Sequence, residues 1–212
     1  MKADPLTCDT IRGALVLDND SPAIDWDSMI FSYQKTDRMY ISHCKQGGDW
    51  SPGVMQDFQN LSMSPAAGVL NYGQGLFEGL KAQRAADGSI VMFRPDRNAS
   101  RMQDGAKRLG MPVVPEEMFL DAARKTVLEN SRWIPPLGKG ALYIRPLLMG
   151  SGAILGVAPA PEYTFLVYVS PVGPYFKGGL KPISLKVSDN FHRAAPGGSG
   201  GVKAIGNYAP GM

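Results

Sequence analysis

The sequence predicts an α+β fold, and three observations lead to this prediction. Short apolar runs of strand length, separated by turn signals, fill the first part of the chain. Two stretches in the middle carry apolar residues at helical spacing, and further strand-length runs follow them. Strands, then helices, then strands is the order typical of a sheet whose helices are grouped together rather than alternating with single strands.

Composition excludes several classes of protein. The chain has 212 residues, of which 44% are hydrophobic and 19% charged, so it can bury a sizeable core. A net charge of +3 and the lack of a basic run with interleaved aromatic residues predict no nucleic-acid partner. No run of about 18 apolar residues occurs, which predicts no membrane span.

The cysteines and the N-terminus bear on the cellular compartment. Cys8 and Cys44 do not have the spacing of metal ligands, so we expect free thiols in a reducing compartment and no metal site. The first residues, Met1–Pro5, lack an apolar segment and an Arg/Ser-rich segment. These observations predict a cytoplasmic protein, with an organelle left open.

The N-terminal part is expected to begin irregularly. Residues 1–22 are polar and rich in Pro and Asp, and we interpret them as an irregular arm. Residues 31–33 and 39–41 are interpreted as two short strands around a turn-prone segment, 35–37.

The next stretch combines glycines with a hairpin signal. Gly73, Gly75 and Gly79 break any long helix, so we expect a short helix that leads into a strand over residues 70–82. Asp87-Gly88 is typical of a hairpin turn and predicts strands on both sides of it.

Two helices and two long strands are predicted after the hairpin. The first helix opens at Pro95 and ends at Gly110, and the second follows Pro115. Residues 142–148 are expected to form a strand, and the apolar run 164–169 a central one.

Domain boundaries are predicted from a segment of linker composition. We expect an arm over residues 1–22, an N-terminal α+β domain over 23–170, a linker over 171–179, and the start of a second α/β domain over 180–212. Residues 183–187 are expected to be a strand of that second domain.

The chemistry-bearing stretch lies near the C-terminus, where the glycine-rich run Gly197–Gly201 is followed by Lys203. Glycine lets a ligand approach the backbone closely, and a lysine amine beside it can act as a Schiff-base nucleophile. The alternative is a flexible loop with a solvated lysine. Arg101 and Arg193 could bind a phosphate through their guanidinium groups, although each alone is typical of a solvated surface charge.

Five motifs in order favour the catalytic interpretation. The sequence resembles the branched-chain amino-acid aminotransferases, in particular the plant-type members, which are fold-type IV enzymes dependent on pyridoxal 5'-phosphate (PLP). The resemblance runs from about Ile24 to Pro210. It rests on the segments 77–82, 93–102, 142–146, 171–176 and 200–208.

The resemblance implies a cofactor site. Lys203 would form the Schiff base with PLP and shuttle the proton at the substrate Cα. Tyr208 would hydrogen-bond the phenolic oxygen of the cofactor, and Arg101 and Arg193 would bind its phosphate. On a regular strand, positions 203 and 208 would lie on opposite faces, so the local turn decides whether both face one pocket.

The resemblance also implies a substrate pocket and a homodimer. Phe77, Tyr143, Arg145 and Tyr175 match residues around the substrate, while Tyr72, Leu155 and Val157 match positions lent to the pocket of a neighbouring subunit. Tyr143 and Arg145 alternate along an expected strand and therefore share a face. Whether Arg145 contacts the substrate carboxylate directly is left open. The implied reaction is transamination of Leu, Ile and Val with 2-oxoglutarate and glutamate.

The sequence departs from the family mainly in length. Family members continue well beyond the lysine, whereas this chain ends at Met212, so we expect a C-terminally truncated member that lacks the carboxylate partner of the pyridine nitrogen. Gln83 stands where many members have an aromatic residue. A catalytically incompetent remnant is one alternative. A D-amino-acid aminotransferase or aminodeoxychorismate lyase of the same fold is another.

Overall fold

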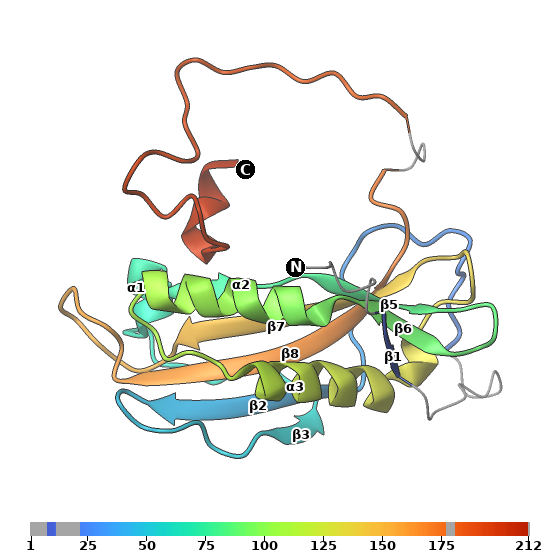
Figure 1. The fold of residues 1–212 in the computed structure, drawn as a ribbon, viewed down its shortest axis with the longest axis horizontal. Coiled ribbons are helices and arrows are strands. Elements are labelled where there is room, and N and C mark those ends of the chain that lie inside the picture. The colour runs from blue at the N-terminus through green and yellow to red at the C-terminus, as the bar shows by residue number, and fades with distance from the viewer. Residues whose placement is uncertain (1–7, 12–21, 177–180, 212) are drawn as a thin grey trace, which may run out of the picture.

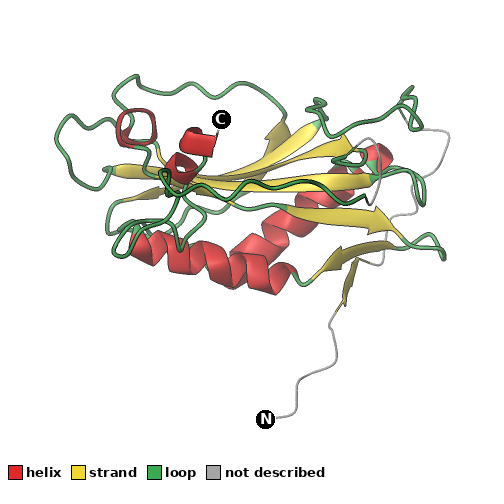
Figure 2. Ribbon diagram, turned by 90° about the horizontal axis from the view of Figure 1, so that it is seen from above, coloured by secondary structure: helices red, strands yellow, loops and turns green. Residues whose placement is uncertain are grey.

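A single antiparallel sheet forms the body of the molecule, and two long helices lie along one of its faces (Figures 1 and 2). The computed structural model describes residues 8–11, 22–176 and 181–211. The sheet has eight strands in the order β1-β6-β5-β7-β8-β2-β3, and β4 pairs with β7 beside this path. The α+β fold class is therefore confirmed.

The strands are β1 (Cys8–Ile11), β2 (Arg38–Lys45), β3 (Val54–Asp57), β4 (Gly75–Phe77), β5 (Leu80–Arg84), β6 (Ile90–Phe93), β7 (Ala141–Gly150) and β8 (Glu162–Val172). The helices are α1 (Gly68–Tyr72), α2 (Pro95–Arg108) and α3 (Glu116–Glu129). Short 3-10 turns lie at η2 (Ser131–Trp133), η3 (Ile205–Asn207) and η4 (Ala209–Gly211). None of the helices among the described residues is long and apolar enough to cross a membrane.

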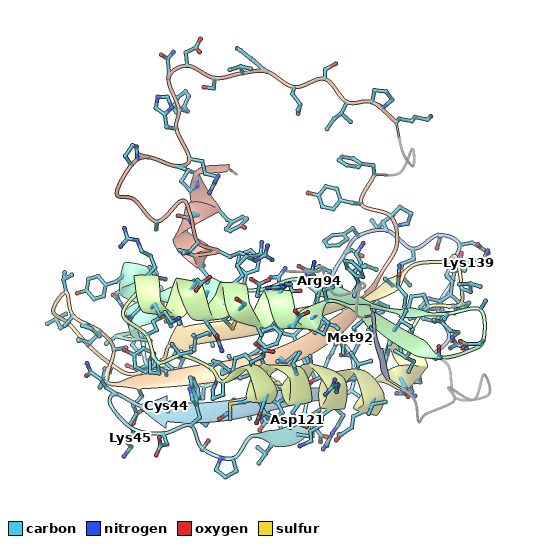
Figure 3. The ribbon with its side chains drawn as sticks, in the orientation of Figure 1. Cys44, Lys45, Met92, Arg94, Asp121 and Lys139 are labelled. Carbon is cyan, nitrogen blue, oxygen red and sulfur yellow. The ribbon has the colours of Figure 1, made fainter. Side chains whose placement is uncertain are left out.

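The core lies between the helices and the central strands β7 and β8. Phe119 of α3 stacks on Phe165 of β8 with ring centroids 6.1 Å apart, and both side chains are buried. Met92 of β6 is also buried in this core, whereas Asp121 of α3 pairs with Lys125 on the helix surface (Figure 3). Helix α2 comes close to β4 because it has Gly105 at the contact, where a Cβ would lie 2.7 Å from Leu76 Cδ2.

The periodic segments have the structure that the sequence predicts. The hairpin at Asp87-Gly88 joins β5 to β6, and the short helix α1 leads into β4. The two predicted helices correspond to α2 and α3, and Gly110 follows α2 with φ +62°, as expected of a glycine that ends a helix. The central strand is β8, which pairs with both β7 and β2.

Three local predictions are wrong. Residues 31–33 form no strand and belong to an irregular segment before β2. Residues 183–187 form no strand either, because a strand requires a pairing partner and this segment has none among the described residues. The arm over residues 1–22 is not irregular throughout, since Cys8–Ile11 pairs with β6 as β1. Residues 1–7 and 12–21 lie outside the described residues.

A buried asparagine fixes the start of β2 against the end of α3. The Asn130 side chain is fully buried, and its Oδ1 accepts hydrogen bonds of 3.0 Å from the backbone N–H groups of Asp37 and Arg38. Its Nδ2 donates to the carbonyls of Arg38 and Thr126. An amide with every hydrogen bond satisfied can be buried at little cost, and it orients the chain on both sides.

We expect Gly173→Ala to destabilise the fold. A Cβ at Gly173 would lie 2.0 Å from the carbonyl oxygen of Met29, and the Gly173 N–H donates to the Ile30 carbonyl at 3.1 Å. The overlap is with backbone, so the end of β8 must shift from the segment before β2, at a cost of about 1–3 kcal/mol. The midpoint of urea unfolding measures this effect. Gly156→Ala is the control, since nothing lies within 4 Å of its added Cβ; equal midpoints for the two variants would contradict the packing argument.

A second expectation concerns acid stability. Hydrogen bonds from Arg132, together with one from Trp133, lower the pKa of the Asp37 carboxyl below its ordinary value. A carboxyl with a lowered folded-state pKa adds stability above its unfolded pKa of about 3.9 and loses that contribution as the pH falls through the folded pKa. The stability difference between the wild-type chain and Asp37→Asn should therefore shrink below pH ~4 in unfolding curves recorded across pH. A difference that stays constant to pH ~2 would show that the ionised carboxylate is not involved.

Candidate active site

Lys203 is attached to the sheet through β4. The Phe77 N–H donates to the Lys203 carbonyl at 3.2 Å, and Leu76 forms an antiparallel bridge with Ala204. Leu76 and Ala204 are both buried in the main core. The backbone of the lysine is therefore held at a defined place beside the central strands.

The lysine and the tyrosine that follows it face each other. Lys203 Nζ donates to Tyr208 OH at 2.8 Å and lies 4.4 Å from the Phe77 ring centroid. The Tyr208 and Phe77 ring centroids are 4.7 Å apart. On a regular strand these positions would point in opposite directions, but the 3-10 turn η3 carries Tyr208 back toward the amine.

The glycine run follows a defined path. Asn207, which is buried, accepts a 2.7 Å hydrogen bond from Ser199 Oγ, and its Nδ2 donates to the carbonyls of Ser199 and Val202. Arg108 at the end of α2 donates to the Gly197 and Gly198 carbonyls. These contacts close the loop on itself and on α2, which differs from the freely flexible loop considered as the alternative.

The four residues predicted to bind the cofactor line one cavity of about 230 Å³. Its walls are Arg101, Arg193, Gly200, Gly201, Val202, Lys203 and Tyr208. Arg193 also donates to the Gly200 carbonyl at 3.4 Å. Two guanidinium groups, one amine and one phenol thus meet beside a backbone that has no side chains at its two glycines.

Arg101 is held by Glu78, a residue to which sequence reasoning assigned no role. Arg101 Nε donates to Glu78 Oε1 at 2.7 Å, and Nη2 donates to Oε2 at 2.6 Å. The hydrogen bonds with Glu78 raise the pKa of the Arg101 guanidinium above its ordinary value. A glutamate that follows a short strand and precedes a glycine carries no sequence signal for burial, so only the structure reveals this contact.

Tyr143 and Arg145 share a face of β7, as predicted, and Arg145 Nη2 donates to Tyr143 OH at 3.1 Å. The Arg145 guanidinium carbon lies 4.6 Å from the Phe77 ring centroid. Among the described residues, Arg145 Nε is buried and has no hydrogen-bond partner. A buried charged donor without a partner is costly, so the Arg145 guanidinium is incompletely satisfied by the residues around it.

Aromatic side chains continue from Tyr143 to Tyr175. Phe31 lies between them, with its ring centroid 5.5 Å from Tyr143 and 5.1 Å from Tyr175. Sequence reasoning missed Phe31 as a site residue because it was assigned to a strand, and no periodic pattern marks it. The irregular segment that contains Phe31 brings its ring to the predicted substrate residues.

The remaining predicted residues lie elsewhere. Tyr72 at the end of α1 donates through its hydroxyl to the Leu155 carbonyl, in the loop between β7 and β8. Leu155 and Val157 are 89% and 91% exposed, and none of the three lines the Lys203 cavity. The structure does not bring this group to the lysine within the described part of the chain.

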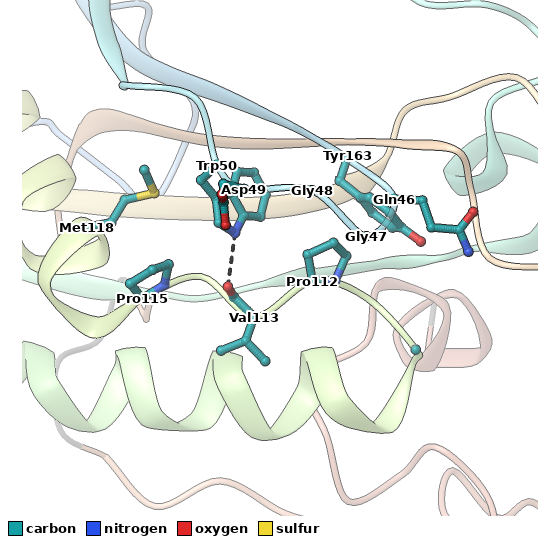
Figure 4. Close-up of a pocket in the computed structure, with 11 residues that line it drawn as sticks. Gln46, Gly47, Gly48, Asp49, Trp50, Pro112, Val113, Pro115, Met118 and Tyr163 are labelled. Carbon is teal, nitrogen blue, oxygen red and sulfur yellow. Dashed lines mark hydrogen bonds between the residues drawn. The ribbon is translucent and has the colours of Figure 1, made fainter.

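A larger hollow of about 690 Å³ lies between the turn after β2 and the loop between α2 and α3 (Figure 4). There Trp50 Nε1 donates to the Val113 carbonyl at 2.9 Å. None of the residues predicted to be functional lines this hollow.

No group of three or more potential metal-binding side chains occurs among the described residues. Within them Cys44 is a free, buried thiol.

Comparison with known proteins places the chain among aminotransferases. No family model matches it. Branched-chain amino acid aminotransferase 2, chloroplastic, of Humulus lupulus is 64% identical over 186 residues, which are 88% of this chain and 46% of the relative. Branched-chain-amino-acid aminotransferase 5, chloroplastic, of Arabidopsis thaliana is 58% identical over 202 residues, which are 95% of this chain and 49% of the relative. The chain thus spans about half the length of the curated relatives it matches.

Solved structures support the fold. The branched-chain amino acid aminotransferase of Escherichia coli superposes with a TM-score of 0.58 at 22% identity, covering 82% of this chain and 53% of that chain. Another branched-chain amino acid aminotransferase, solved with pyridoxamine 5'-phosphate, superposes with a TM-score of 0.55 at 21% identity over the same shares of the two chains.

The names of the relatives bear on location and on family. Both plant relatives are named as chloroplastic, which does not support the predicted cytoplasmic location. The high identity to the plant enzymes and the shared fold together show that the chain belongs to the branched-chain amino-acid aminotransferase family of fold type IV.

Proposed function

We propose that the protein is a PLP-dependent aminotransferase that transfers the amino group of Leu, Ile or Val to 2-oxoglutarate, with Lys203 as the residue that binds the cofactor covalently. The observation that carries the proposal is the 2.8 Å contact between the Lys203 amine and the Tyr208 hydroxyl, in a cavity shared with Arg101 and Arg193. The family of the chain supports it, as does the pyridoxamine 5'-phosphate in one of the related structures.

The residues of the cavity fit the chemical groups of PLP. Two guanidinium groups suit a phosphate, since each can donate two parallel hydrogen bonds. The glycine backbone allows close approach, and Tyr208 can donate to a phenolate oxygen. The amine of Lys203 suits an aldehyde. When bound, PLP supplies an electron sink for the substrate carbanion.

Lys203 would then act as the general base. With cofactor and substrate bound, the Lys203 amine would be placed to take the proton from the substrate Cα. Tyr208 would orient this amine through their hydrogen bond, and the Phe77 ring, 4.4 Å from Nζ, would exclude water on that side.

The substrate pocket is proposed on the aromatic side of Phe77. Phe31, Phe77, Tyr143 and Tyr175 would surround an aliphatic side chain, and Arg145 would supply positive charge for a carboxylate. Such a pocket discriminates between aliphatic side chains by only about 1–3 kcal/mol of transition-state binding free energy per methylene. It would therefore accept all three branched-chain amino acids.

We further propose a homodimer. Leu155 and Val157 are almost fully exposed and Tyr72 is 43% exposed, and together they form an apolar group around α1 and the loop between β7 and β8. Exposed apolar groups of this kind favour contact with another protein surface. A second copy of the chain is the partner that the family resemblance implies.

We expect Lys203→Ala to abolish covalent cofactor binding. The wild-type chain mixed with PLP should develop a visible absorbance that changes when leucine is added, and the variant should show the spectrum of free PLP. Lys81→Ala is the control, because Lys81 is an exposed lysine on β5 outside the cavity. An absorbance in Lys203→Ala equal to that of the wild-type chain would refute the assignment. Covalent binding without any response to leucine would support the incompetent alternative.

We expect Tyr208→Phe to retain covalent PLP but to react more slowly with leucine. The ring contact with Phe77 can remain, whereas the hydrogen bond to Lys203 Nζ is lost. Loss of a hydrogen bond to a charged group should slow the leucine-dependent spectral change by about tenfold to a hundredfold. Stopped-flow absorbance measures this change. Tyr33→Phe, at an exposed tyrosine, is the control, and an unchanged rate in Tyr208→Phe would remove the proposed orienting role.

A further inference from the structure

Glu78 is a carboxylate with no exposed surface. It lies between β4 and β5, where its N–H donates to the Pro146 carbonyl of β7 at 2.8 Å. Removing a carboxylate from water is costly unless other groups satisfy it, so charged residues are almost never fully buried without partners. The contacts of Glu78 therefore indicate what its burial achieves.

Both carboxylate oxygens of Glu78 point to one side of α2. Oε1 accepts from Arg101 Nε at 2.7 Å, and Oε2 accepts from Arg101 Nη2 at 2.6 Å and from Asn98 Nδ2 at 2.8 Å. Asn98 and Arg101 lie three residues apart on the helix and thus on the same face. The two parallel bonds fix the plane of the guanidinium as well as its distance.

The bonds to Glu78 use only one edge of the Arg101 guanidinium. An arginine has five N–H donors, and the Nε and Nη2 contacts occupy two of them. The Nη1 group has no hydrogen-bond partner among the described residues, and the Arg101 side chain is 54% exposed where it lines the Lys203 cavity. The edge formed by Nη1 and the second Nη2 proton is thus left for a ligand.

Stability alone does not account for this arrangement. A half-exposed arginine on a helix surface needs no buried partner, and a buried ion pair is on average no more stabilising than apolar residues of the same volume. The two bonds to Glu78 give the Arg101 guanidinium a fixed direction, which a flexible, solvated arginine would not have.

We propose that Glu78 is a positioning residue, which turns the free edge of the Arg101 guanidinium toward the phosphate of the ligand bound at Lys203. The proposal rests on the proposed function, since it takes the ligand phosphate to lie against Arg101. Glu78 acts through Arg101 and does not itself line the cavity.

The charge of Glu78 has an electrostatic effect on phosphate affinity that is opposite in sign to the effect of positioning. The negative charge of Glu78 weakens the attraction of Arg101 for an anion, so a purely electrostatic role would make phosphate bind more tightly once Glu78 is neutral. A positioning role makes phosphate bind more weakly, because the guanidinium loses its orientation. The sign of the change therefore separates the two roles.

The experiment compares Glu78→Gln with the wild-type chain, using inorganic phosphate as the probe. Phosphate that binds the folded chain raises its unfolding temperature, and the concentration dependence gives the dissociation constant without covalent attachment to Lys203. We expect this constant to rise about tenfold or more in Glu78→Gln, the loss typical of a charge-assisted hydrogen bond.

A second measurement uses PLP and pyridoxal, which differ only in the phosphate. The preference of the wild-type chain for PLP should fall about tenfold in Glu78→Gln, while its affinity for pyridoxal stays the same. Asp37→Asn is the matched control, because Arg132 binds Asp37 with the same two-bond geometry outside the Lys203 cavity. It should change stability without changing the preference for PLP.

Every outcome decides the proposal. Phosphate affinity that is unchanged or stronger in Glu78→Gln would overturn it, and so would a wild-type chain that phosphate does not stabilise. If Glu78→Gln does not fold, Glu78→Asp is the second variant. It keeps the charge but is too short to reach both Arg101 Nε and Nη2, and it should show the same loss of phosphate affinity. Failure of the proposed function appears separately, as the absence of a Lys203-dependent absorbance in a chain that still binds phosphate.

Discussion

The hydrogen bond from the Phe77 N–H to the Lys203 carbonyl is the contact on which the site depends. It continues the antiparallel bridge between Leu76 and Ala204, and residues opposite each other in an antiparallel pair point to the same side. This pairing explains why the Lys203 amine lies over the Phe77 ring. A segment far along the chain thereby takes its place from a three-residue strand in the middle of the fold.

The end of that strand and the residue after it support both ends of the site. Phe77, the last residue of β4, contacts Lys203 and Arg145, whereas Glu78, which follows β4, contacts Arg101. Gly79 follows because a Cβ there would lie 2.0 Å from Tyr143 OH. The sequence Phe-Glu-Gly thus meets three requirements: an aromatic wall, a buried acceptor, and space for a substrate-side tyrosine.

Periodicity predicted the elements that pack through regular faces, such as α2, α3 and the central strand β8. It failed at residues 183–187, because alternation indicates that a segment suits a sheet and not that a partner strand is present. The order of motifs predicted a site at Lys203 with two arginines, which line one cavity in the structure, but no pattern could show that a 3-10 turn brings Tyr208 back to the amine. Glu78 was beyond sequence reasoning, since its burial depends on a helix packed over it.

The charges around Lys203 explain why an orienting carboxylate must lie outside the cavity. No acidic residue is among those that line it, whereas two arginines and the lysine are. The cavity therefore favours an anion, to which the guanidinium groups can donate charge-assisted hydrogen bonds. A carboxylate inside would cancel this attraction. Glu78, buried beneath α2, binds one edge of Arg101 and leaves the other edge charged and directed.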